Sequence, residues 1–228
     1  MLHAYQQDFI ELLVRHQVVR FGDFTLKSGR RSPYFINAGQ LRTGRAIAGL
    51  GAAYAACIDR HRLPCDLVFG PSYKGVPLAV ATAIAASHGD RDLPYAFDRK
   101  EAKDHGEGGT FVGTAPAAGM RVVIVDDVIT SGVSIREAAQ LLRRAADVHL
   151  SGVVIAVDRR ERGPSGRSTA EELGSELGLQ IRPIITIHEL VAHLHGRELD
   201  GQLILDDARL AAIRSYLAEH GAEPAGAL

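Results

Sequence analysis

The sequence predicts an α/β protein built on a doubly wound, mainly parallel sheet flanked by helices. Residues 122–125 form an unbroken apolar run, which is typical of a strand covered on both faces. Residues 67–70 and 148–157 are two further apolar runs. Between residues 67 and 187 strand-like runs alternate with helical patterns, as parallel strands joined by crossover helices do.

Length and composition describe an ordinary globular protein that fits a single domain, residues 1–228. Its residues are 46% hydrophobic and 23% charged, with a formal net charge of −1. This balance gives no reason to expect a nucleic-acid or membrane partner, and no apolar run approaches the ~20 residues that span a bilayer. Cys57 and Cys65 show no metal-motif spacing, which favours free thiols in a reducing compartment. Without a signal-peptide pattern, we expect a cytoplasmic location.

The first 40 residues predict a helix followed by a β-hairpin. Apolar residues recur at helical spacing over residues 4–19. Two β-prone pieces, residues 24–27 and 33–37, flank the turn residues Ser28, Gly29 and Arg30. The hairpin therefore has a cationic tip, either for a ligand or as solvated charge on an antiparallel appendage.

The next segment places a lysine after a predicted strand. Residues 43–62 are helical, with Thr43 as the expected N-cap. The strand at residues 67–70 leads into a loop with Lys74 and Gly75, and a helix follows at residues 76–87. Lys74 at the carboxyl end of a strand could meet an anionic ligand; a plain surface lysine is the alternative.

A charged segment separates two short predicted strands at residues 93–97 and 110–112. Residues 98–109 between them are too charged to pack and contain three glycines near their end. The segment is interpreted as a lid over a site or as a solvated hairpin loop. Its cationic residues are Arg99, Lys100, Lys103 and His105.

The C-terminal third continues the alternation of strands and helices. The apolar run at residues 148–157 ends in the charged sequence Asp158-Arg159-Arg160-Glu161-Arg162. A helix at residues 171–177, a strand at 180–187 and a last helix at 203–217 follow.

Residues 121–134 join the central strand to a helix through a polar loop. The strand ends in Asp126 and Asp127, and hydroxyl side chains with a glycine follow at residues 130–134. Hydroxyls and the N–H groups of a helix start form a cup for an anion. The loop lacks the lysine of a nucleotide-triphosphatase phosphate loop. Carboxylates repel phosphate but accept hydrogen bonds from hydroxyls, so the pair beside the cup suggests a ribose 5-phosphate.

This stretch resembles the phosphoribosyl-pyrophosphate motif of the type I phosphoribosyltransferases, whose fold the chain is expected to adopt. Four other segments resemble the orotate phosphoribosyltransferases of that family, and the resemblance covers the chain from the first helix to about residue 194. They are Phe24-Thr-Leu-Lys-Ser-Gly-Arg with Ser32-Pro-Tyr-Phe, Gly70-Pro-Ser-Tyr-Lys-Gly-Val-Pro, Arg99-Lys-Glu-Ala-Lys-Asp-His-Gly-Glu-Gly and Asp158-Arg-Arg-Glu-Arg-Gly.

The resemblance implies transfer of a 5-phosphoribosyl group to orotate, giving orotidine 5′-monophosphate and pyrophosphate in UMP biosynthesis. Residues 1–40 would form the N-terminal helix and a hood over the base. The 5-phosphate would bind Thr130, Ser131, Gly132, Val133 and Ser134, with Asp126 and Asp127 facing the ribose. Pyrophosphate would meet Lys74, Arg99, Lys100, Lys103 and His105. Orotate would contact Lys27, Phe35, Ile36, Thr130 and Arg159, with Arg159 paired to its carboxylate.

The resemblance also implies Mg²⁺ and a homodimer. Mg²⁺ would bridge pyrophosphate oxygens and so bind mainly through the substrate. Lys103 and His105 would act on the neighbouring subunit's site, and with Asp126 and Asp127 they are the expected catalytic residues. Ile36 stands where many family members have an aromatic residue. The alternatives are a phosphoribosyltransferase for another base, and a regulator that senses phosphoribosyl pyrophosphate without catalysis.

Overall fold

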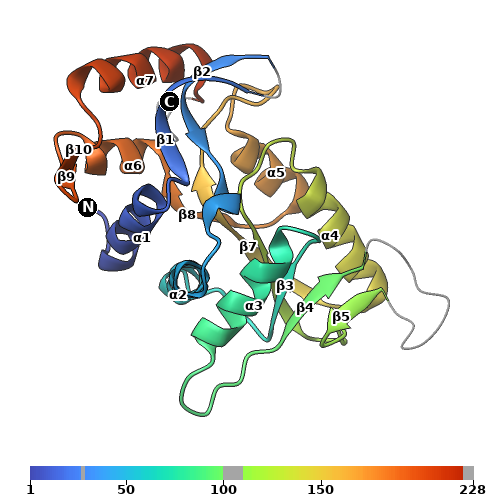
Figure 1. The fold of residues 1–228 in the computed structure, drawn as a ribbon. Helices are drawn as coiled ribbons and strands as arrows, with labels where there is room; N and C mark the ends of the chain where they lie inside the picture. The colour runs from blue at the N-terminus through green and yellow to red at the C-terminus, as the bar shows by residue number, and fades with distance from the viewer. Residues whose placement is uncertain (27–28, 100–109, 223–228) are drawn as a thin grey trace.

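The structure is a computed structural model that describes residues 1–26, 29–99 and 110–222 (Figure 1). Its N-terminal half comprises α1 (Ala4–Arg15), β1 (Val19–Thr25), β2 (Arg31–Ile36), the 3₁₀ turn η1 (Ala38–Gln40), α2 (Gly44–Arg60), β3 (Leu67–Gly70), α3 (Gly75–Ala86), β4 (Tyr95–Asp98) and β5 (Phe111–Gly113). The remainder comprises β6 (Arg121–Asp126), α4 (Val133–Ala145), β7 (His149–Asp158), α5 (Thr169–Leu177), β8 (Ile181–Thr186), α6 (Ile187–Leu194), β9 (Glu198–Leu199), β10 (Gln202–Leu203) and α7 (Asp207–His220).

Six of the described strands form one central sheet in the order β5–β4–β3–β6–β7–β8. The pairs β4–β3, β3–β6, β6–β7 and β7–β8 are parallel, whereas β5 pairs antiparallel with β4 at the edge. The chain adds β4 and β5 on one side of β3, and then β6, β7 and β8 on its other side. This reversal between β3 and β6 is typical of a doubly wound sheet. The predicted fold class is confirmed.

Strand β6 explains why the sheet is covered on both faces. Val122 and Ile124 belong to a core that includes Ile135 and Leu142 of α4, while Val123 and Val125 belong to a second core with α1, α2, α3 and α6. These four aliphatic side chains are fully buried, which is worth about 1.5–3 kcal/mol for each large aliphatic group. Ile135, Ala138, Ala139 and Leu142, which recur at helical spacing, form the buried face of α4.

The loop after β3 is tight because two glycines meet there. A Cβ atom on Gly75 would lie 2.6 Å from the carbonyl carbon of Gly70, so any side chain would force the backbone apart. This approach lets α3 begin at Gly75, directly after the loop that contains Lys74.

The N-terminal hairpin packs between the sheet's carboxyl end and α7 (Figure 1). β1 and β2 are antiparallel, and both strands are longer than the sequence indicated. Tyr34 is fully buried and meets the ring of Tyr216 on α7 edge-on, at 5.6 Å between centroids. On the other side of β2, Phe35 stacks on Phe24 at 5.6 Å.

Two predicted helix boundaries are wrong. The first helix ends at Arg15 rather than at residue 19, because Gln17 adopts a φ of 54° and turns the chain into β1. The last helix begins at Asp207 rather than at residue 203, because the side chain of Asp206 caps it by accepting from the Arg209 N–H at 2.8 Å. Residues 202–203 instead pair with β9 in a short hairpin.

No helix in the described ranges combines the length and the apolar character needed to cross a membrane.

Candidate active site

Apart from Phe35 and Ile36, which lie in β2, the described residues of the predicted site lie at the carboxyl ends of parallel strands. Lys74 follows β3, Arg99 follows β4, residues 127–134 follow β6 and Arg159 follows β7. Because these strands are neighbours in one parallel sheet, their loops lie along the same edge. Lys27, Lys100, Lys103 and His105 lie outside the described residues.

Asp126 ends β6 as a buried carboxylate that is fixed by neighbouring groups. Its Oδ1 accepts from the Asp127 N–H at 2.9 Å, and its Oδ2 accepts from the Ser134 hydroxyl at 2.7 Å. From α2, the Tyr54 hydroxyl donates to its backbone carbonyl at 2.7 Å. Burial raises the pKa of Asp126 above its ordinary value; the Asp127 charge also raises it, and the Ser134 hydrogen bond opposes the shift. The hydrogen bonds thus fix the position of the Asp126 carboxylate, while its burial disfavours its charged form.

Asp127 joins the central loop to the loop after β3. Its Oδ2 accepts from Lys74 Nζ at 2.7 Å, and its Oδ1 accepts from the Val128 N–H at 2.8 Å. The side chain of Asp127 is 8% exposed, but that of Lys74 is 70% exposed. The Lys74 ammonium therefore pairs with Asp127 while most of its side chain remains open to an incoming anion.

Residues 130–134 form an open turn at the start of α4. Thr130, Ser131 and Ser134 are exposed, and Gly132 precedes the helix with a φ of 73°. This left-handed conformation favours glycine, and a Cβ atom there would also lie 3.0 Å from a Leu173 methyl group. Within the described residues no side chain caps α4, so its first-turn N–H groups are available to an anion.

Arg136 and Glu176 connect this turn to α5. Arg136 Nη1 donates to the Ser131 carbonyl at 2.6 Å. The same guanidinium pairs with Glu176 of α5 at 2.6 Å. The turn is therefore connected to a helix on the same face of the sheet, as well as to its own helix α4.

Arg159 lies beside the β1–β2 hairpin, the predicted hood. Its side chain is 14% exposed and its guanidinium carbon lies 4.8 Å from the centre of the Tyr34 ring. Its Nε and Nη2 donate to Glu161 Oε1 at 3.0 and 2.6 Å. A planar fork held in this way, at the end of the strand next to β6, is suited to a carboxylate.

The hood residues Phe35 and Ile36 point in different directions. Ile36 packs against the core that includes α1, α2, α3 and α6. Phe35 is half-buried in its stack with Phe24, and the Arg20 guanidinium lies 5.6 Å from the Phe35 ring. The aromatic surface of the hood therefore comes from Phe35 rather than from Ile36.

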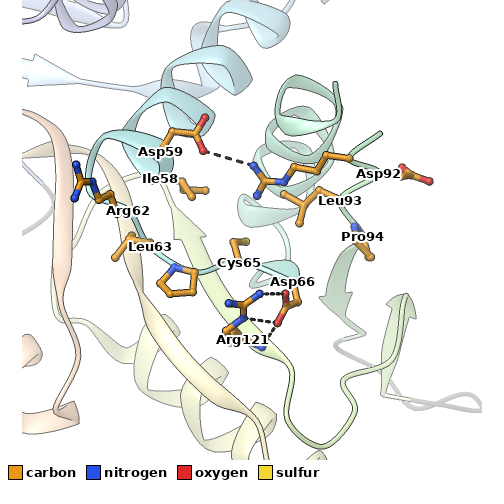
Figure 2. Close-up of a pocket in the computed structure, with 12 residues that line it drawn as sticks. Ile58, Asp59, Arg62, Leu63, Cys65, Asp66, Asp92, Leu93, Pro94 and Arg121 are labelled. Atoms are coloured by element: carbon orange, nitrogen blue, oxygen red, sulfur yellow. Dashed lines mark hydrogen bonds and ion pairs between the residues drawn. The ribbon is translucent and has the colours of Figure 1, made fainter. Parts of the chain in front are cut away.

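A cavity of about 600 Å³ lies at the opposite, amino end of the sheet (Figure 2). Two ion pairs line it: Arg121 pairs with Asp66 at 2.5 Å, and Arg91 pairs with Asp59 at 3.5 Å. Hydrogen bonds from Arg121 lower the pKa of Asp66 to about 2. None of the predicted site residues that the structure describes lines this cavity, which lies at the end of the sheet away from them.

Comparison with known proteins identifies the family. Residues 37–173 match the model of the phosphoribosyl transferase domain family. An orotate phosphoribosyltransferase of Photorhabdus laumondii is 48% identical over 221 residues, covering 96% of this chain and 100% of the relative. The chain belongs to the orotate phosphoribosyltransferase family.

Other members of this family agree in sequence and in fold. The orotate phosphoribosyltransferase of Halorhodospira halophila is 50% identical over 224 residues, covering 97% of this chain and 100% of the relative. The crystal structure of the orotate phosphoribosyltransferase of Francisella tularensis superposes with a TM-score of 0.79 at 32% identity, covering 93% of this chain and 98% of that one.

The sequence did not predict the groups that surround Arg159 in this member of the orotate phosphoribosyltransferase family. Glu161 lies two residues away in a run of mixed charge, a pattern that contained the signal for its ion pair. Tyr216 reaches the same carboxylate from α7 at 2.8 Å. No sequence signal links residues separated by 55 positions, so the structure was needed to find this contact.

Proposed function

We propose that the protein transfers the 5-phosphoribosyl group from phosphoribosyl pyrophosphate to orotate, giving orotidine 5′-monophosphate and pyrophosphate in UMP biosynthesis. One arrangement supports this proposal: the carboxylates at the end of β6 and the turn at residues 130–134 lie at the same edge of the sheet as the largely enclosed Arg159 side chain after β7. Parallel pairing of β6 with β7, with Asp126 in register with Ile155, supports a short span between the two loops. The 48–50% identity to orotate phosphoribosyltransferases supports the same reaction.

The proposed roles follow the charge that develops during the reaction. The leaving pyrophosphate gains negative charge, which Lys74 and Arg99 would stabilise, while the sugar becomes cation-like beside Asp126 and Asp127. The 5-phosphate would bind the turn at residues 130–134 through hydroxyls and helix N–H groups. Direct displacement with inversion requires no protein nucleophile.

Orotate would be recognised by its carboxylate and its ring. Arg159 supplies a planar fork for the carboxylate, and Phe35 offers an aromatic wall on the hood. Lys27 and Thr130 complete this set by resemblance to family members. A neutral purine would leave the Arg159 fork without a partner, which favours orotate over a purine base.

The carboxyl edge fits a Mg²⁺ ion that arrives with the substrate. Mg²⁺ prefers oxygen ligands and often combines one or two carboxylates with substrate phosphates. Asp126 and Asp127 supply such oxygens, and the described residues contain no cluster of three or more His, Cys, Asp or Glu that would hold a metal alone. When bound, the ion would neutralise charge on the pyrophosphate.

We propose that residues 1–228 work as one catalytic domain, with residues 1–40 as the hood, within a homodimer. Lys100, Lys103 and His105 would reach pyrophosphate, the last two on the neighbouring subunit's site; support for these roles comes from the family resemblance. Free thiols at Cys57 and Cys65 support a reducing compartment such as the cytoplasm.

An absorbance assay tests the reaction. We expect purified protein to consume orotate, seen as loss of its ultraviolet absorbance, when phosphoribosyl pyrophosphate and Mg²⁺ are both present. Omission of any one component should stop the loss, and orotidine 5′-monophosphate should accumulate. Binding of phosphoribosyl pyrophosphate without consumption of orotate would contradict the proposal and favour another base or a regulatory role.

A further inference from the structure

Glu161 is the centre of a hydrogen-bonded cluster that the proposed reaction does not yet use. Its Oε1 accepts from Arg159, as described above, and from the Tyr216 hydroxyl at 2.8 Å. Its Oε2 accepts from Arg30 Nη2 at 2.9 Å. With its side chain 19% exposed, Glu161 makes these contacts largely shielded from water, where charged hydrogen bonds are stronger than at the surface.

The partners of Glu161 come from three separate parts of the fold. Arg30 belongs to the turn of the hood hairpin, Arg159 follows β7, and Tyr216 lies on α7. Arg30 also lies over the Tyr216 ring, 5.8 Å from its centre. A single carboxylate therefore connects the hood, the sheet edge and the C-terminal helix.

The end of α7 is fixed to the segment that carries Glu161. The Arg162 N–H donates to the His220 carbonyl at 2.8 Å, and the Ala222 N–H donates to the Arg160 carbonyl at 2.7 Å. Glu161 itself forms a β-bridge with Gly221. Because α7 is held to the backbone on both sides of Glu161, Tyr216 has a defined position from which to donate.

The geometry of the Arg159 fork shows what Glu161 achieves. A guanidinium has five N–H donors and two edges that can grip a carboxylate. Glu161 Oε1 engages the side edge, formed by Nε and Nη2. The end edge, formed by Nη1 and the second hydrogen of Nη2, is a second fork whose direction is fixed once the first is engaged.

The charges in the cluster also fit a carboxylate ligand. Arg30 and Arg159 carry two positive charges, and Glu161 neutralises one of them. Burial raises the pKa of Tyr216, and its contact with Glu161 raises it further, so its hydroxyl stays protonated as a donor at neutral pH. The cluster keeps one net positive charge, which matches a single orotate carboxylate.

We propose that Glu161, held by Tyr216, is a positioning residue that aims Arg159 at the carboxylate of orotate. This inference rests on the proposed function and adds α7 and the hood turn to base recognition. A different role would make Glu161 a competitor that orotate must displace. The two roles predict opposite changes in the Michaelis constant for orotate.

Glu161→Gln tests the positioning role. Glutamine keeps the size but loses the charge, so the Arg159 fork is held less firmly. We expect the KM for orotate to rise about tenfold, while kcat and the KM for phosphoribosyl pyrophosphate stay within about twofold. Tyr216→Phe removes one hydroxyl and should raise the orotate KM in the same direction by a smaller factor.

The matched control is Glu219→Gln, the same exchange on α7 at a side chain that is 75% exposed. Control and wild type should show equal constants. A fall or no change in the orotate KM of Glu161→Gln would overturn the inference while wild-type turnover upholds the proposed function; absence of wild-type turnover would remove both. If Glu161→Gln does not fold, as judged by thermal unfolding, Tyr216→Phe decides by the same criterion.

Discussion

Asp126→Asn is expected to lower kcat by about 10²–10³ while making the folded protein more stable at neutral pH. The loss of turnover follows because the carboxylate proposed to face the cation-like ribose becomes neutral. Asparagine has the same shape and can keep both hydrogen bonds of Asp126, accepting from the Asp127 N–H and donating to the Ser134 hydroxyl. Steady-state kinetics and thermal unfolding of the same preparation test both effects.

The pH dependence of stability follows from the raised pKa of Asp126. Because the folded protein binds this proton more tightly than the unfolded chain, the group stabilises the fold below its ordinary pKa of 3.8. That stabilisation is lost as pH rises through the raised folded-state pKa. We therefore expect the Tm of Asp126→Asn to match wild type in acid and to exceed it at neutral pH, by about 2–4 °C for each kcal/mol relieved.

Asp90→Asn is the control, since it makes the same exchange at an exposed turn. Its Tm should follow wild type at every pH. A lower Tm for Asp126→Asn at neutral pH, or unchanged turnover, would show that this carboxylate does not carry the proposed combination of electrostatic cost and function.

Arg159→Ala is expected to raise the KM for orotate by roughly 30- to 150-fold, and that for phosphoribosyl pyrophosphate by less than threefold. Removal of one partner from an enclosed charged pair costs about 2–3 kcal/mol or more. The effect should fall on orotate because Arg159 follows β7, whereas the turn proposed to hold the 5-phosphate, residues 130–134, follows β6. Initial rates with each substrate varied in turn measure the two constants.

Arg159→Lys separates charge from shape in the same assay. Lysine keeps the charge but lacks the planar fork, so we expect an orotate KM between those of wild type and Arg159→Ala. Equal increases in both Michaelis constants for Arg159→Ala would argue against a role specific to the base.

The central sheet was predictable because its strands are buried on both faces. The run at residues 122–125 has no polar position, so it fits only a strand buried on both faces, and the structure places its side chains alternately in two cores.

Helix ends were less predictable. Val19 is buried and suits the expected helical face, but it belongs to β1 because the chain turns at Gln17. Asp206 is a typical N-cap residue and could have indicated that the last helix begins at Asp207. The apolar spacing that starts at residue 203 led instead to an earlier predicted start.

The candidate site likewise contains a part that local sequence predicts and a part that depends on the tertiary fold. Asp126, Asp127 and residues 130–134 lie in one short segment, so their joint presence at a strand end followed from local sequence. The Lys74–Asp127 pair joins residues 53 positions apart, and only the strand order brings them to one place. The surroundings of Arg159 depend on the hood and on α7, which pack together through burial of Tyr34 and Tyr216 rather than through any motif.

The most direct test of the account is the ratio of kcat/KM for orotate to that for uracil, measured with the wild-type protein. Uracil is orotate without the carboxylate, so the ratio reports how far the site depends on that group. A site built to pair a buried fork with the ligand should favour orotate by at least about 10³-fold. Comparable efficiencies for the two bases, or a preference for a purine, would contradict the proposed recognition of orotate by Arg159.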